Sequence, residues 1–161
     1  AGCSTGEEAY SLAIVFLEAV ERERPKVRYT LQVFATDLDR NAIEKARRGV
    51  YPVNISSDVS PGRLGRFFVK EESGDYRVMQ QIRDMVTFAP HDLVKDAPFT
   101  RLDILVCRNV LIYLEPVVQR RVMANFHYAL NRQGFLLGTG TRRIWACFVH
   151  RRDAEDAEIL A

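Results

Sequence analysis

The sequence alternates between amphipathic helical segments and short apolar segments, and this alternation limits its possible folds more than any other feature. Apolar residues recur at helical spacing in residues 7–23, and Pro25 ends that segment. The Val/Phe/Leu-rich residues 29–36 then predict a strand. Further strands are predicted at residues 85–89, 102–107, 134–138 and 145–149. The alternation predicts an α/β fold with a mainly parallel sheet.

Three more helices are predicted over residues 41–49, 61–68 and 116–130. Asp39 is placed to cap the first, which ends at Gly49, and Ser60 followed by Pro61 is an N-terminal signal for the second. A turn with Gly74 and an alternating segment at residues 76–80 predict a hairpin.

The segment 102–107 is nearly continuous in apolar residues, as expected of a parallel strand buried on both faces. The chain's 161 residues, 47% of them hydrophobic, suffice for one domain, and we expect residues 1–161 to form it. A glycine loop at residues 2–6 ordinarily follows a strand, so we expect a fragment truncated at its N-terminus.

Charge and cysteine content exclude several classes of function. A net charge of +2 predicts neither nucleic-acid binding nor membrane binding. The apolar run at residues 10–20 is too short to span a bilayer. The three cysteines, Cys3, Cys107 and Cys147, include no Cys-x-x-Cys pair. This pattern disfavours a disulfide framework or a zinc site and is typical of a reducing cytoplasm, so we expect no metal.

The opening loop holds Gly2 and Gly6 and leads directly into the first helix. Such loops bring backbone N–H groups close to a ligand at a helix N-terminus. A phosphate loop would continue with Lys and Ser or Thr, whereas here Glu7 and Glu8 follow. Two carboxylates would repel a phosphate and favour a cationic ligand such as a sulfonium. The alternative is that they only complement the helix dipole.

In open α/β sheets, ligands bind at the carboxyl ends of the strands. Asp37 stands at one such end, where an acidic residue typically accepts from ribose hydroxyls; its alternative role is helix capping, for which Asp39 is better spaced. Asp92 follows the next strand and would meet either an adenine or only its own turn.

Cys107, Arg108 and Asn109 end the most apolar strand. A charged residue there is costly to bury unless it is paired or solvated in a cleft, which makes Arg108 a candidate site residue. Tyr113 lies four residues beyond Asn109, so both would share one face of a helical turn; its alternative role is core packing. Cys3 and Cys107 are expected to be small structural residues rather than nucleophiles.

Four motifs in order resemble those of chemotaxis receptor protein-glutamate methyltransferases. They lie at residues 1–13 (AGCSTGEEAYSLA), 34–39 (FATDLD), 46–51 (ARRGVY) and 107–113 (CRNVLIY). The resemblance extends to about Gly138. Residues 57–61, 82–86 and 88–91 look closer to the methyltransferase half of methylesterase–methyltransferase fusion proteins.

This resemblance implies a class I methyltransferase fold, Rossmann-like, with a small antiparallel β insertion at about residues 60–84 on the receptor-binding side. It implies S-adenosylmethionine as methyl donor, S-adenosylhomocysteine as product, and glutamates of chemoreceptor cytoplasmic helices as acceptors. It also implies fused signalling domains and a cytoplasmic location. The implied cofactor-binding residues are Gly2, Gly6, Glu8, Asp37, Asp92, Leu93, Cys107, Arg108 and Asn109. Arg108 and Tyr113 would lie near the transferred methyl.

Two other functions compete with this one. A nicotinamide-dependent oxidoreductase would need a Gly-x-Gly-x-x-Gly loop, which residues 2–6 do not provide. A catalytically degenerate module that binds the cofactor or a partner is motivated by residues 138–143, where Gly-Thr-Gly-Thr-Arg-Arg replaces the Gly-x-Ser-Glu-like signature expected from the family.

Overall fold

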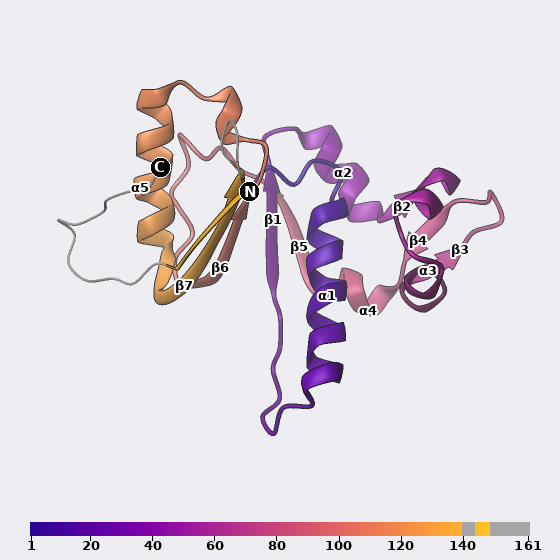
Figure 1. The fold of residues 1–161 in the computed structure, drawn as a ribbon. Coiled ribbons are helices and arrows are strands. Elements are labelled where there is room, and N and C mark those ends of the chain that lie inside the picture. Colours follow the sequence, from indigo (N-terminus) through magenta and orange to yellow (C-terminus); the bar gives the residue numbers. More distant parts are fainter. Residues whose placement is uncertain (140–143, 149–161) are drawn as a thin grey trace. The chain divides into compact units, whose positions relative to one another are not determined.

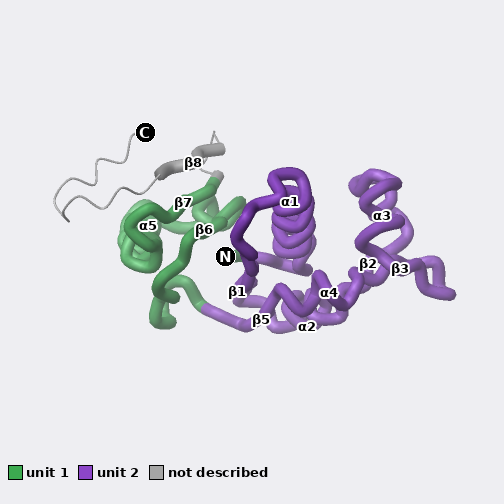
Figure 2. Tube along the Cα trace, turned by 90° about the horizontal axis from the view of Figure 1, so that it is seen from below, with its two compact units in different colours: residues 1–2, 92–161 green, residues 3–91 purple. Residues whose placement is uncertain are grey.

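The computed structural model describes residues 1–139 and 144–148, which form two compact units (Figures 1 and 2). One unit comprises residues 3–91, and the other comprises residues 1–2 together with the chain from residue 92 onward. The two glycines of the opening loop therefore fall in different units.

The unit of residues 3–91 contains a parallel strand pair and a small antiparallel sheet. Its helices and strands in chain order are α1 (Glu7–Glu23), β1 (Val33–Asp37), α2 (Arg40–Arg48), β2 (Val50–Tyr51), η1 (Val53–Ser57), α3 (Pro61–Phe67), β3 (Phe68–Lys70), β4 (Tyr76–Val78), α4 (Gln80–Arg83) and β5 (Val86–Pro90). Strands β1 and β5 pair in parallel, and the antiparallel sheet has the order β2-β4-β3. The predicted hairpin is confirmed as β3–β4, with Gly74 at φ 92° in its turn.

One face of the β1–β5 pair carries the core of this unit. Ala35 and Phe88 are register partners on that face, and they pack in one cluster with α1 and α2. The Tyr10 ring of α1 meets Phe88 edge-on at 5.3 Å between centroids. Phe34 points to the opposite face and is half exposed. The helices therefore fix β1 and β5 from one side.

The second unit contains β6 (Leu102–Cys107), η2 (Leu111–Tyr113), α5 (Pro116–Ala129), β7 (Leu130–Thr139) and β8 (Ile144–Phe148). Strands β6 and β7 are parallel, and β8 pairs antiparallel with β7. The mainly parallel α/β architecture is thus confirmed. Helix α5 packs Val122 and Phe126 against Leu105 and Leu136, which forms the core of this unit.

Burial of β6 on both faces was a wrong expectation. Ile104 is 59% exposed, and its register partner Phe135 on β7 is 52% exposed. Within this unit the described helix α5 covers only the opposite face, where Leu105 and Cys107 are buried.

Several element boundaries also differ from the predictions. The strand predicted from Tyr29 begins only at Val33, because its partner β5 extends over five residues alone. The strand predicted over residues 76–80 ends at Val78, since Gln80 starts α4. Ser60 is the N-cap residue of α3 but makes no side-chain capping bond. The atypical residues 140–143 and Val149 lie outside the described residues.

Candidate cofactor site

The opening loop is fastened to the end of β1 and turns into α1 at Gly6. The Cys3 amide donates to the Thr36 carbonyl at 2.9 Å, and the Gly6 amide donates back to the Cys3 carbonyl at 2.8 Å. Gly6 has a φ of 92°, and a Cβ on it would lie 2.9 Å from the Cβ of Ala46 and 3.0 Å from the Phe88 ring. Only glycine suits both this backbone conformation and this close approach.

Asp37 holds the loop in place with its carboxylate. Its Oδ2 accepts from the Ser4 amide at 2.7 Å, and its Oδ1 accepts from the Asp39 amide at 3.0 Å. Each carboxylate oxygen retains a second lone pair, so the half-buried group is still able to accept from ligand hydroxyls. Helix capping belongs to Asp39, whose side chain accepts from the Asn41 amide at 2.8 Å, as predicted.

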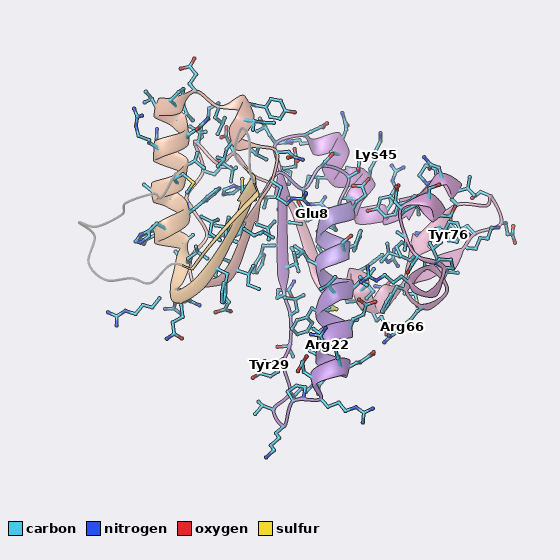
Figure 3. All side chains as sticks on the ribbon, viewed as in Figure 1. Glu8, Arg22, Tyr29, Lys45, Arg66 and Tyr76 are labelled. Carbon is cyan, nitrogen blue, oxygen red and sulfur yellow. The ribbon has the colours of Figure 1, made fainter. Side chains whose placement is uncertain are left out.

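The two glutamates at the start of α1 differ in their surroundings. Glu7 accepts from the Thr5 hydroxyl with both carboxylate oxygens, at 2.6 and 2.7 Å, which ties it to the loop itself. Glu8 is half-buried at the N-terminal end of α1, where Figure 3 labels it. No side-chain bond caps this helix in the described part of the chain. Backbone N–H groups and two acidic side chains therefore meet at one helix end.

Sequence reasoning missed one residue at this loop, Tyr51 on β2. Its hydroxyl donates to the Thr5 carbonyl at 2.9 Å, although only 7% of the residue is exposed. The sequence signal was a tyrosine two residues after the helix-ending Gly49, because a buried tyrosine normally finds a partner for its hydroxyl. Cys3 is a buried residue of the loop, and burial, followed by the nearby Asp37 charge, raises the pKa of its thiol to about 11. The thiol is thus protonated at neutral pH, as expected of a structural cysteine.

A groove of about 350 Å³ in the same unit is lined in part by Glu7. Its lining residues are Glu7, Tyr10, Ser11, Ile14, Tyr51, Ile55, Asp58, Val59, Arg63 and Phe68. Neither Glu8 nor Asp37 is among them, so this groove is distinct from the predicted cofactor residues.

In the second unit, Gly2 packs against the segment that follows β6. Gly2 has a φ of 68°, and a Cβ on it would clash with Cγ2 of Val110. The predicted glycine is therefore required by local conformation and packing. A direct contact between Gly2 and the cofactor stays a prediction.

Asp92 has the contacts of a turn residue, which is the alternative that the sequence left open. Its Oδ1 accepts from the amides of Val94 at 2.9 Å and Lys95 at 3.2 Å. These bonds, the Val94 bond first, hold the pKa of the Asp92 carboxyl below its usual value. Leu93 packs, half-buried, against the core of this unit. The adenine contact of Asp92 and Leu93 stays a prediction.

The end of β6 exposes Arg108 and Asn109 directly after the fully buried Cys107. Because the Cys107 side chain is enclosed, only its backbone is placed to meet a ligand. Asn109 adopts a φ of 55°, a left-handed conformation that asparagine tolerates better than most residues. Tyr113 lies in η2 and is 81% exposed, so the core-packing alternative is wrong for it.

The family model described as "CheR methyltransferase, SAM binding domain" matches residues 1–142. The chain belongs to this family. S-adenosylmethionine is accordingly its cofactor.

Relatives and solved structures agree with this placement. The chain is 42% identical over 144 residues to an uncharacterized 104.1 kDa protein of Rhodobacter capsulatus. The matched region covers 89% of this chain but 15% of that protein. It is 34% identical over 139 residues to the chemotaxis protein methyltransferase of Vibrio parahaemolyticus, covering 85% of this chain and 50% of the relative. The chain thus spans half or less of these relatives.

The crystal structure of a TehB-like SAM-dependent methyltransferase from Corynebacterium glutamicum matches with a TM-score of 0.50 at 20% identity. It covers 89% of this chain and 54% of that one. This likeness supports the fold alone, which is the class I methyltransferase fold predicted from the sequence.

The residues of this CheR-family chain fit the chemistry of the cofactor. S-adenosylmethionine combines a cationic sulfonium with a ribose. The first turn of α1 supplies two glutamates, and the end of β1 supplies the acceptor Asp37, all within one unit. Among the described residues, no group of three or more His, Cys, Asp or Glu side chains is arranged to hold a metal ion. None of the helices described is both long and apolar enough to cross a membrane.

Proposed function

We propose that the chain is the cofactor-binding part of an enzyme that transfers a methyl group to glutamate side chains of chemoreceptor cytoplasmic helices and forms glutamyl methyl esters. The observation that carries the proposal is the direct bond between the Ser4 amide and the Asp37 carboxylate. It joins two of the four family motifs, so that the carboxylate of Asp37 lies against the opening loop. Carboxylate acceptors at this loop suit a nucleoside with a cationic substituent.

The residues of the loop would bind and orient the donor. Glu8 holds the cationic methionine end, Asp37 accepts from the ribose hydroxyls, and the segment from Asp92 to Leu93 meets the adenine. When bound, S-adenosylmethionine supplies a methyl group activated by its sulfonium. Holding donor and acceptor in a reactive geometry is worth roughly 7–11 kcal/mol in general, so positioning alone is able to supply much of the catalysis.

Arg108 and Tyr113 are the proposed residues for the acceptor. A glutamate carboxylate, with an ordinary pKa of about 4.3, is already ionised at neutral pH and needs no general base. A guanidinium forms charge-assisted and often bidentate bonds with a carboxylate. Arg108 therefore orients the acceptor glutamate, and Tyr113 lines its approach.

The chain is proposed to act as one module of a larger signalling protein. The 104.1 kDa relative, of which the chain covers 15%, supports this proposal, because most of that protein consists of other sequence.

The test combines binding and transfer in the full-length protein. Calorimetric titration with S-adenosylhomocysteine measures cofactor binding, and transfer of a radiolabelled methyl group to receptor cytoplasmic fragments, released as methanol by alkali, identifies a methyl ester. Fragments whose candidate glutamates are replaced by alanine serve as the control. Cofactor binding without alkali-labile transfer would favour the catalytically degenerate module instead.

A further inference from the structure

The loop of residues 3–8 is held from two different structural elements. On one side, the end of β1 binds it through the Thr36 carbonyl and the Asp37 carboxylate. On the other side, β2 binds it through the Tyr51 hydroxyl, which donates to the Thr5 carbonyl. The second attachment comes from the small antiparallel sheet, where Tyr51 pairs with Tyr76, which Figure 3 labels on β4.

The Tyr51 side chain is rigidly placed for this bond. It is almost fully enclosed, and its ring meets the Tyr10 ring edge-on at 6.3 Å and 84°. Burial raises the pKa of the Tyr51 phenol far above its ordinary value, and the neighbouring Glu7 charge raises it further. The hydroxyl consequently remains a donor over the whole pH range in which such an enzyme is assayed.

We propose that Tyr51 is a positioning residue that fastens the cofactor loop to the small antiparallel sheet. The bond fixes the Thr5 carbonyl, and the Thr5 side chain in turn orients Glu7 in the first turn of α1. Tyr51 touches no cofactor atom in this proposal; it acts through the loop. The proposal rests on the assignment of this loop to the cofactor, which is part of the proposed function.

The chain contains a closely matched control for Tyr51. The Tyr10 hydroxyl also donates from a buried phenol to a backbone carbonyl, that of Ala46, at 2.8 Å. The two rings belong to the same core cluster. Only the Tyr51 bond ends on the loop, so Tyr51→Phe and Tyr10→Phe remove equivalent hydrogen bonds with different targets.

The experiment compares the two variants in the full-length protein. Tyr51→Phe is expected to raise the Kd for S-adenosylhomocysteine about three- to tenfold, the effect of one neutral hydrogen bond, and to raise the KM for the donor without lowering kcat. Tyr10→Phe is expected to leave the Kd within about twofold. Both variants should lose similar unfolding stability, so a merely structural role would not separate them.

Hydrogen exchange of the cofactor-free protein gives a second, independent measurement. The Ser4 amide donates to the Asp37 carboxylate, and the Gly6 amide donates to the Cys3 carbonyl. Tyr51→Phe should therefore speed the exchange of a peptide covering residues 1–8, and Tyr10→Phe should not. Equal effects of the two variants, or no effect of Tyr51→Phe, overturn the proposal. If the wild-type protein binds no S-adenosylhomocysteine, the proposed function fails, and the exchange comparison alone still decides the role of Tyr51.

Discussion

The ends of β1 and β6 occupy the same topological position in two parallel strand pairs, yet they are constructed in opposite ways. At the end of β1, the Asp37 carboxylate is fixed by two backbone amides. At the end of β6, the exposed Arg108 precedes Asn109, which has a left-handed φ, and the exposed Tyr113 ends the short 3-10 helix η2. The first arrangement is pre-organised for a ligand of fixed shape, whereas the second presents long side chains at the surface.

This difference suggests that the two strand ends have different functional roles. A pre-formed acceptor should control cofactor affinity, since little ordering is needed on binding. Exposed side chains that act on the acceptor should control turnover instead. Substitutions at the two ends are therefore expected to change different kinetic quantities.

The largest effect is expected at Gly6, the pivot of the pre-organised loop. Gly6→Ala combines a left-handed φ, which costs about 1–2 kcal/mol, with overpacking against Ala46 and Phe88, so the free energy of unfolding should fall by about 3 kcal/mol. Gly74→Ala is the control, because Gly74 has the same φ of 92° but no atom near its Cβ position. Urea unfolding should give only about 1 kcal/mol for Gly74→Ala. Equal losses would contradict the steric argument.

Local signals explain why much of the fold was predictable. Helix α2 was located by Asp39 at its start and Gly49 at its end, and both residues make the expected capping bonds. The loop and Asp37 were recognised because short motifs carried them. The prediction that Asp39 rather than Asp37 caps the helix followed from spacing alone.

Features that depend on distant partners were not predictable. Strand β2 has two residues and exists only because β4, about twenty-five residues later, pairs with it. The exposure of Ile104 depends on which faces of the sheet other segments cover, which an apolar run does not encode. The Tyr51 bond to Thr5 spans 46 residues, so the local sequence around Tyr51 does not identify its partner.

The second-largest effect is expected at Arg108, the exposed residue that follows β6. Arg108→Ala should lower kcat/KM for methyl transfer to receptor fragments about a hundredfold, while the Kd for S-adenosylhomocysteine stays within about threefold. Arg120→Ala, at an exposed arginine on α5, is the control for the loss of a positive charge. If Arg108→Ala weakens cofactor binding as much as turnover, the proposal that the two strand ends have different roles is wrong.

A smaller effect, on cofactor affinity alone, is expected at Asp37, at the end of β1. Asp37→Asn removes a charged acceptor of the Ser4 amide and of the ribose, and the Kd for S-adenosylhomocysteine should rise about tenfold. Asp39→Asn is the matched control two residues away, because asparagine caps a helix as well as aspartate does. Calorimetry on both variants separates the two residues, and a similar rise for Asp39→Asn would mean that general charge, not the Asp37 position, matters.

The smallest effect is expected at Asp92, which tests whether the second unit holds any pre-organised acceptor of its own. Its Oδ1 accepts from two amides of its own turn, and the amide oxygen of asparagine is able to accept the same bonds. Asp92→Asn should therefore change the Kd for S-adenosylhomocysteine by less than about twofold, since an uncharged oxygen is able to accept both the turn bonds and a bond from the adenine amino group. A tenfold rise, matching that of Asp37→Asn, would show that the Asp92 charge meets the cofactor directly. Both units would then contribute acceptors to affinity, and the contrast between the ends of β1 and β6 would rest on Arg108 and Tyr113 alone.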